Sequence, residues 1–475
     1  MARSRGRRVR PPVTVTLDRL EAKHCSGFAE DGRRFKVRGV GVGDVVVARP
    51  GKKGTARLSE VVTPAPDSVA PKCPLFGICG GCQLQTMALH RQREEKAGLV
   101  RRLVGIDDDD GNRVLTDVVC YPTRGAPDGY AYRNKVELSW STSLYVPEGV
   151  DRTDVQTTGS FLGFHPPGWW SKVVPVSRCA LASDAMNAVV EAVSALQLAP
   201  AWDSRAHTGA WRHLVLRDTG TPENPRVWVT FVTTSTVDTA DLQQAADAVA
   251  ALPFVEGVLH VVNDGVAEVA RGELRAVLHG TSDLQVTLGA AAFTLPHDAF
   301  FQVNSQGAEV LVETIADALG LTDGVREPLV DLYCGVGAIG LALSDRVGRL
   351  VGIEVHEGAV VSARENARAL GIEAEFHAGP VEHVLPGLAL GDHTRLVVDP
   401  PRAGLHPKAA AFLADHKADV LVYVACGPKS LGRDREVLEA GGWRLTDLWT
   451  VDLFPQTHHL EAVARFVRSP SADST

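Results

Sequence analysis

The C-terminal part of the sequence predicts an α/β fold built on a doubly wound parallel sheet. From about residue 300 onward, short apolar runs alternate with segments that have helical periodicity. The runs PLVDLY, RLVGIE, TRLVVD and DVLVYVA are typical of strands, and a Gly-rich turn follows the first of them. Strands that alternate with helices form parallel sheets, and these sheets bind ligands at the carboxyl ends of their strands. We therefore expect a ligand site along that edge.

The N-terminal part predicts a separate, basic β-barrel. Within residues 11–65, short runs of alternating apolar and polar residues are separated by Gly and Asp, which is typical of small antiparallel barrels. Barrels of this kind often bind nucleic acid. Residues 1–60 contain 15 Lys and Arg against 6 Asp and Glu, whereas the whole chain has a net charge of −8. The barrel is therefore expected to attract phosphate backbones. For the tail 1–10, a solvated and disordered basic segment stays open as an alternative.

Composition excludes several classes of protein. The chain has 475 residues, of which 45% are hydrophobic and 22% charged, as in globular proteins. It contains no apolar run long enough to span a membrane, and the basic N-terminus lacks the apolar core of a secretory signal. We expect a cytoplasmic location, no membrane contact and no obligate protein partner. Disulfides are rare in that compartment, so clustered cysteines are candidate metal ligands.

The Gly-rich turn at 331–340 (DLYCGVGAIG) predicts a cofactor that contains a nucleoside. Gly335 and Gly337 allow the backbone to approach a ligand closely. Glu354 ends the next strand, where a carboxylate can accept the two hydroxyls of a ribose. The pattern G-x-G-x-x-G also fits NAD, so a nicotinamide oxidoreductase is an alternative at this point.

The residues at the end of the fourth expected strand restrict which kind of atom the protein can act on. It reads Asp399-Pro-Pro-Arg402. Methyltransferases that act on amino groups carry a similar motif with an aromatic residue in the last position. An arginine cannot stack in the same way, but it can donate two hydrogen bonds to a phosphate or a carbonyl. The motif therefore argues against an exocyclic nitrogen as the target.

Cys426 and Glu461 are the candidate nucleophile and base. A thiolate that adds to one carbon of an unsaturated ring makes the neighbouring carbon nucleophilic, and a base must afterwards remove a proton so that the thiolate can leave. Cys426 stands between a strand and an expected helix, whose N-terminus favours a thiolate. Glu461 begins the apolar run that ends in AVARFV, where partial burial would raise its pKa. From spacing alone, a buried core cysteine and an edge-strand acid stay open as alternatives.

Four cysteines form a candidate metal site. Cys73, Cys79 and Cys82 lie within ten residues, and Cys179 can supply a fourth ligand. Such a set suits zinc or an iron–sulfur cluster. Zinc sites usually show two close pairs, so three clustered cysteines and one remote cysteine favour a [4Fe–4S] cluster.

Together these motifs resemble the RNA uracil-5-methyltransferase family, in the branch with an N-terminal TRAM domain and an iron–sulfur cluster. The resemblance spans about residues 11–468 and rests on CPLFGICGGCQLQ, FFQVN, DLYCGVGAIGL, VVDPPRAGL, YVACGPKSLGRD and LFPQTHHLE. It implies a TRAM barrel at 11–65, a central α+β domain with the cluster at 66–290, and a Rossmann-like class I methyltransferase domain at 291–468. Residues 469–475 would be a tail.

The resemblance also implies an activity and a set of site residues. The activity is methyl transfer from S-adenosylmethionine to a uridine in RNA, giving 5-methyluridine, with ribosomal RNA favoured over transfer RNA. Cys426 would be the nucleophile, Glu461 the base, and Arg133 an RNA contact. The S-adenosylmethionine contacts would be Gln302, Tyr333, Gly335, Gly337, Glu354 and Asp399. The ligands of the cluster would be Cys73, Cys79, Cys82 and Cys179.

Two positions depart from the family pattern. Ala338 stands where many members have Asn, and Gly427 stands where the nucleophile motif more often reads Cys-Asn-Pro. Neither residue offers a side-chain hydrogen bond. A non-catalytic RNA-binding protein with a relic methyltransferase fold is therefore the main alternative.

Overall fold

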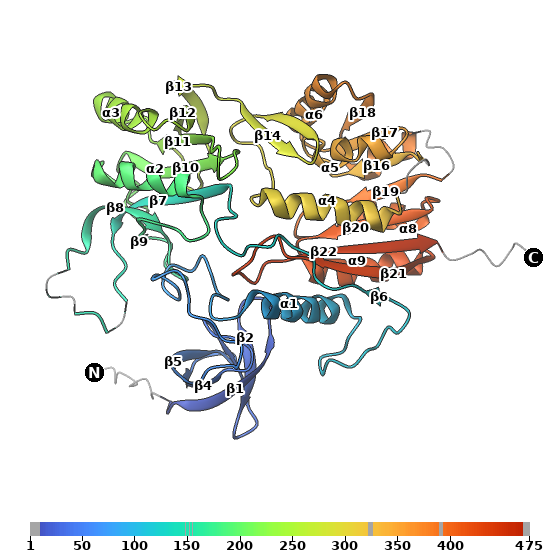
Figure 1. The fold of residues 1–475 in the computed structure, drawn as a ribbon, viewed down its shortest axis with the longest axis horizontal. Helices are drawn as coiled ribbons and strands as arrows, with labels where there is room; N and C mark the ends of the chain where they lie inside the picture. The colour runs from blue at the N-terminus through green and yellow to red at the C-terminus, as the bar shows by residue number, and fades with distance from the viewer. Residues whose placement is uncertain are drawn as a thin grey trace, which may run out of the picture.

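The computed structural model describes residues 10–147, 149–151, 153, 155–321, 326–388 and 393–468. The chain folds into an N-terminal barrel, a central sheet with helices, and a C-terminal α/β unit (Figure 1). In Figure 1 the central and C-terminal sheets stand side by side, with the barrel below them. Among the described residues, no helix has both the length and the apolar character needed to cross a membrane.

The N-terminal unit is a five-stranded antiparallel sheet in the order β3-β2-β1-β4-β5. Its strands are β1 (Val13–Leu20), β2 (Cys25–Ala29), β3 (Arg34–Val37), β4 (Val45–Pro50) and β5 (Ala56–Thr63). The two edges meet where the amide of Lys36 donates to the carbonyl of Gly54 at 2.8 Å. Alternate residues of β1 point inward and are buried, including Val15 and Leu17. The sheet therefore curls into a small barrel with its own apolar centre.

The central sheet has the order β13-β12-β11-β10-β7-β8-β9, and α2 and α3 share its core. The strands are β7 (Lys135–Ser143), β8 (Thr158–Phe164), β9 (Val174–Pro175), β10 (Trp211–Asp218), β11 (Val227–Thr233), β12 (Val255–Val262) and β13 (Glu273–Gly280). The helices are α2 (Asp184–Ala195) and α3 (Thr239–Ala250). A hairpin of β14 (Leu284–Leu288) and β15 (Ala291–Leu295) follows and packs in the C-terminal core.

The C-terminal sheet has the order β18-β17-β16-β19-β20-β22-β21-β6. The pairs from β18 to β20 are parallel, and β22 runs antiparallel to both of its neighbours. Its strands are β16 (Leu329–Leu332), β17 (Leu350–Glu354), β18 (Ala374–Ala378), β19 (Arg395–Val398), β20 (Val420–Ala425), β21 (Trp443–Val451) and β22 (Glu461–Arg468). The doubly wound sheet expected from the sequence is therefore present.

Helices cover both faces of this sheet, as alternation of strands and helices requires. They are α4 (Ser305–Leu319), α5 (Ala338–Ala342), α6 (Glu357–Leu370), α7 (Val381–Val384), α8 (Pro407–Asp415) and α9 (Pro428–Ala440), with single 3-10 turns at Ser344–Arg346 and Leu385–Gly387.

One segment departs from the expected central unit of 66–290. Helix α1 (Leu89–Val104) packs against α9 and β21, and β6 (Val119–Cys120) pairs in parallel with β21. Figure 1 shows α1 beneath the C-terminal sheet and beside the barrel. The first part of that unit therefore belongs to the C-terminal core, where Leu99, Val100 and Val104 are buried.

Candidate active site

Five chemically active side chains gather at one edge of the C-terminal sheet. Parallel strands end at the same edge, and the antiparallel strand β22 begins there. Asp331 lies in β16 and Glu354 ends β17, while Asp399 follows β19, Cys426 follows β20 and Glu461 opens β22. The structure therefore brings together residues that the sequence separates by up to 130 positions.

The Gly-rich turn after β16 is held in a tight backbone conformation. Tyr333, Gly335 and Gly337 have φ angles of 65°, 54° and 80°, in the left-handed region that glycine tolerates best. The amides of Tyr333 and Cys334 both donate to the carbonyl of Ile353, at 2.9 and 3.1 Å. This anchors the turn to the end of β17, beside Glu354.

Glu354 is poised to accept hydrogen bonds from a ligand. Its side chain is nearly buried, and its two oxygens accept from the amides of Gly335 at 3.2 Å and His356 at 2.9 Å. A carboxylate oxygen has a second lone pair, so both oxygens keep acceptor capacity. This geometry suits a ribose with two adjacent hydroxyls.

Gln302 and Tyr333 are two further predicted cofactor contacts. Gln302 is half-buried, and its carbonyl oxygen accepts a hydrogen bond from the Asn134 side chain at 2.9 Å. Tyr333 is half-buried, and burial raises the pKa of its hydroxyl to about 12. The amide of His406, just before α8, donates to that hydroxyl. The Tyr333 ring packs against the apolar core of the C-terminal unit.

Asp331 has a structural role that the sequence analysis did not assign. It is fully buried, and its Oδ2 accepts from the amide of Gly340 at 3.0 Å, which fixes the start of α5. Its Oδ1 has no partner among the described residues. Burial, with the charges of Asp399 and Glu354, raises the pKa of Asp331 to about 7. The detectable signal was a charged residue inside an otherwise apolar strand.

Cys426 lies half-buried between β20 and α9, as the sequence predicts. Burial raises the pKa of its thiol to about 11, and the negative charges of Glu461 and Asp399 act in the same direction. Arg402 opposes them, because its positive charge favours the thiolate. Arg402 is therefore the group that favours the thiolate.

Glu461 lies close enough to Cys426 for its charge to affect the thiol. It is only 4% exposed, and burial together with Asp399 raises its pKa well above the usual value for a glutamate, while Arg402 opposes the shift. Burial likewise raises the pKa of Asp399 to about 7. A carboxyl group with a raised pKa is suited to accept and release a proton near neutral pH.

Gly427 has a steric reason in this chain. A Cβ atom there would lie 2.9 Å from the carbonyl oxygen of Arg402. The Ser430 hydroxyl lies 2.7 Å from the Gly427 carbonyl and 3.2 Å from that of Arg402. The absence of a side chain at Gly427 therefore allows the turn after β19 (residues 399–402) to contact the turn that contains Cys426. Ala338 begins α5, which has no side-chain cap at its N-terminus.

The thiol and Arg402 predict a specific pH dependence. Below pH 11 the thiolate fraction rises about tenfold per pH unit, so if Cys426 is the nucleophile that the resemblance implies, formation of a covalent adduct with RNA should accelerate from pH 7 to 9. Arg402→Met should slow adduct formation at every pH and move the profile to higher pH, and Arg402→Lys should retain part of the effect. Single-turnover rates over this range are the measurement. A flat profile shared by wild type and Arg402→Met would contradict this role.

The four predicted ligand cysteines are free thiols, and burial and the charges of neighbouring cysteines raise the pKa values of Cys79 and Cys82. Burial raises the pKa of Cys82 to about 12, and the charges of Cys179 and Cys79 act in the same direction. Burial raises the pKa of Cys79, and the charges of Cys179 and Cys73 act in the same direction. Four sulfur donors suit an iron–sulfur cluster. Within the described parts of the chain, however, no three His, Cys, Asp or Glu side chains are arranged to hold a metal ion.

A basic pocket of about 490 Å³ lies on the barrel. Its lining consists of Arg10, Arg33, Arg34, Phe35, Gly51, Lys52, Lys53 and Gly54. Arg33 and Arg34 form ion pairs with Asp31 at 2.6 Å and Asp18 at 2.8 Å, outside the pocket lining. The pocket itself is lined by five cations and no acid, which favours an anionic ligand.

Comparison with known proteins identifies the family. Residues 384–468 match the family described as tRNA (Uracil-5-)-methyltransferase, and residues 302–407 match the methyltransferase small domain. An uncharacterized RNA methyltransferase of Chlorobaculum tepidum is 34% identical and covers 96% of both chains. One from Caldanaerobacter subterraneus is 32% identical over 96% of this chain and 99% of its own.

Two further comparisons concern enzymes with a named target. A tRNA (uracil(54)-C(5))-methyltransferase of Pyrococcus horikoshii is 29% identical over 86% of this chain and 88% of its own. The crystal structure of the Pyrococcus abyssi tRNA (uracil-54, C5)-methyltransferase with S-adenosyl-L-homocysteine aligns with a TM-score of 0.73, at 24% identity, over 96% of this chain and all of that one. The fold is thus of the class I methyltransferase type, and the chain belongs to the RNA uracil-5-methyltransferase family.

Proposed function

We propose that this protein transfers a methyl group from S-adenosylmethionine to carbon 5 of a uridine in RNA. The observation that carries the proposal is the meeting of Cys426, Glu461 and Arg402 at the carboxyl edge of the sheet. A thiol beside a cation supplies a nucleophile, and a buried carboxyl group supplies a base. The two carboxyl groups beside them, Asp399 and Glu354, line the same edge.

In the proposed mechanism Cys426 acts first. Its thiolate, favoured by Arg402, forms a bond to carbon 6 of the uracil, which makes carbon 5 nucleophilic. S-adenosylmethionine, when bound, supplies the methyl group. Glu461 then accepts the carbon 5 proton, the electrons of that C–H bond restore the carbon 5–carbon 6 double bond, and the bond between carbon 6 and sulfur breaks. The thiolate of Cys426 and the protonated Glu461 remain, and release of that proton restores the starting state.

The cofactor would be held by residues around the Gly-rich turn. Glu354 would accept the ribose hydroxyls with the acceptor capacity left on its two oxygens. Gly335, where a Cβ atom would meet nothing within 4 Å, leaves room for the cofactor, whereas Gly337 packs against Phe376. The half-buried Gln302 and Tyr333 and the nearby Asp399 complete the proposed set.

We also propose that Cys73, Cys79, Cys82 and Cys179 hold a [4Fe–4S] cluster. In addition to burial, the charges of these cysteines raise the pKa values of Cys79 and Cys82, so the four thiols lie near one another, and this supports the proposal. Anaerobically purified protein is expected to be brown and to contain iron and sulfide, and Cys82→Ser should lose the colour, whereas Cys120→Ser should keep it. Metal and sulfide analysis is the measurement. A colourless wild-type protein with one zinc would overturn the assignment.

The barrel pocket would contribute affinity for RNA. Each Lys or Arg that neutralises a phosphate releases a counterion, so affinity depends on salt. Lys52→Ala/Lys53→Ala should weaken RNA binding and lower the slope of log K against log salt by about 2, roughly one per cation removed. Lys23→Ala, at an exposed barrel position outside the pocket, is the matched control. Equal slopes for all three proteins would contradict this role.

The RNA class can be decided with labelled S-adenosylmethionine. Unmodified transfer RNA and ribosomal RNA transcripts would be offered in equal amounts to wild-type protein that contains its cluster. Sequence resemblance favours ribosomal RNA, whereas the named relatives of known target act on transfer RNA. Labelled product in either class supports the proposed activity and names its substrate. RNA binding without label in any RNA would favour the relic alternative.

A further inference from the structure

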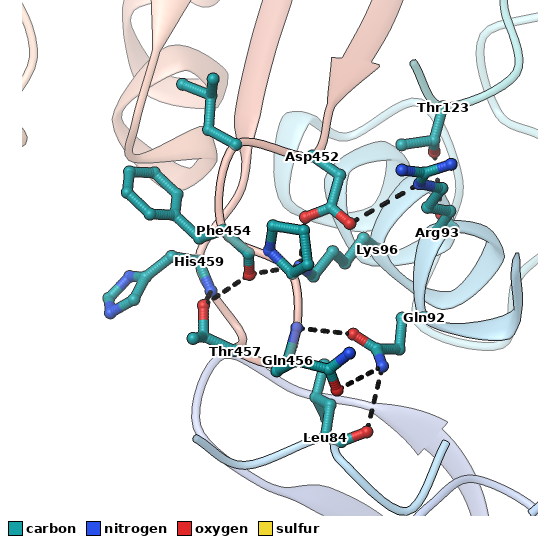
Figure 2. A network of polar contacts seen from close by, with 12 residues as sticks. Leu84, Gln92, Arg93, Lys96, Thr123, Asp452, Phe454, Gln456, Thr457 and His459 are labelled. Carbon is teal, nitrogen blue, oxygen red and sulfur yellow. Dashed lines mark hydrogen bonds and ion pairs between the residues drawn. The ribbon is translucent and has the colours of Figure 1, made fainter. Parts of the chain in front are cut away.

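A buried polar network joins helix α1 to the loop that leads to Glu461 (Figure 2). We call residues 452–460 the base loop, because they connect β21 to Glu461. The Lys96 side chain on α1 is fully buried, and its Nζ donates to Asp452 Oδ1 at 2.6 Å and to the Phe454 carbonyl at 3.0 Å. Asp452 is equally buried, so this ion pair is shielded from water.

Gln92, one helical turn before Lys96, holds the middle of the base loop. The amide of Gln456 donates to Gln92 Oε1 at 2.8 Å, and Gln92 Nε2 donates to Gln456 Oε1 at 2.9 Å. The same Nε2 is also within hydrogen-bond distance of the Leu84 and Met87 carbonyls. Gln456 has a φ angle of 67°, which is costly for a residue other than glycine. The pair of contacts with Gln92 fixes it there.

The base loop is also tied to other parts of the chain. The carbonyl of Gln456 accepts from the amides of Gln83 at 2.8 Å and Leu84 at 3.0 Å, directly after the clustered cysteines. The Tyr132 hydroxyl donates to the Pro455 carbonyl at 3.0 Å, and the Asn304 side chain donates to the Leu453 carbonyl at 2.9 Å. Contacts from three other segments therefore hold the loop just before it delivers Glu461.

We propose that Lys96 and Gln92 are positioning residues for the proton-removal step, because they hold the base loop so that Glu461 reaches the carbon 5 proton. This inference rests on the proposed methyl transfer. It explains why a lysine is buried here at all. Burying an ion pair is a poor source of stability, since desolvation offsets the attraction, whereas two fixed partners define one geometry.

The inference separates two steps of the reaction. The hydrogen bonds of Lys96 and Gln92, which we call the clamp, reach the base loop, whereas attack by Cys426 depends on the turn after β20. Removal of the carbon 5 proton and breakage of the carbon 6–sulfur bond depend on Glu461. Weakening the clamp should therefore leave attack and methylation nearly intact. It should make the release of the RNA slower, so that methylated RNA stays attached to Cys426.

The variants are Lys96→Met and Gln92→Leu, with Lys417→Met and Gln244→Leu as matched exposed controls. The readouts are turnover, the fraction of enzyme in a covalent methyl-labelled RNA adduct on denaturing gels, and the melting temperature. We expect turnover to fall about 10-fold to 100-fold in the clamp variants while the adduct accumulates, and we expect the controls to behave as wild type.

A double variant separates positioning from stability. Lys96→Met leaves the buried Asp452 with only its longer ion pair to Arg93, at 3.7 Å, and should lower stability, whereas Lys96→Met/Asp452→Leu replaces the closer pair with apolar side chains. The double variant should recover the melting temperature and still accumulate adduct. Wild-type turnover in a folded double variant, or turnover that falls without adduct, would overturn the inference. If wild type itself forms neither adduct nor 5-methyluridine, the proposed function fails instead.

Discussion

Cys426→Ala is expected to abolish methyl transfer. Without the thiol no bond to carbon 6 forms, so carbon 5 stays a poor nucleophile, and turnover should fall by at least about 10³-fold. RNA affinity should change little, because the barrel pocket is expected to supply much of it and Cys426 is one half-buried side chain. Measurement of methyl transfer beside RNA binding distinguishes these two effects.

The matched control for this substitution is Cys120→Ala. Cys120 is also a half-buried free thiol, but it lies in the edge strand β6. It should keep wild-type activity and form the same covalent adduct. Residual activity of Cys426→Ala within tenfold of wild type would show that another group starts the reaction.

Glu461→Gln should stall the reaction after methylation. The amide keeps the size of the side chain but cannot accept the proton, so turnover should fall about 10²-fold to 10⁴-fold. Cys426 can still attack, and methylated RNA should accumulate as a covalent adduct. The ratio of adduct to released product, measured in a single turnover, tests this prediction. Loss of adduct and product together would contradict the role of Glu461 as base.

The same variant makes a prediction about stability. A glutamate whose pKa is raised in the folded state binds its proton more tightly there than in the unfolded chain. Its ionisation therefore costs stability as the pH rises above the unfolded value of about 4.3. Glu461→Gln should be at least as stable as wild type at pH 7, and the difference should shrink towards pH 4. Thermal melts at both pH values check the sign.

The carboxyl edge of the C-terminal sheet could be predicted from the sequence because its signals are local. Glu354, Asp399 and Cys426 each end or follow an apolar run, whereas Glu461 begins one. Parallel pairing then brings these ends together without further information. The family prediction is confirmed by relatives that cover nearly the whole chain. The roles of the individual site residues stay predictions.

Long-range polar contacts could not be predicted in this way. Lys96 and Asp452 lie 356 positions apart, and a lysine on an amphipathic helix is normally solvent-exposed. The two-residue strand β6 is likewise too short to leave a periodic pattern, so the placement of 89–120 on the C-terminal sheet was missed. The sequence indicates that glycine at position 427 forgoes a side-chain hydrogen bond. The structure shows that the Arg402 carbonyl approaches too closely for a side chain there.

The central claim is that a uridine is methylated at carbon 5 through Cys426. The most direct test is to incubate unmodified RNA with labelled S-adenosylmethionine and either wild type or Cys426→Ala, and then to digest the RNA to nucleosides. The account predicts label in 5-methyluridine with wild type and none with Cys426→Ala. Label in any other nucleoside, or equal label with both proteins, would contradict it.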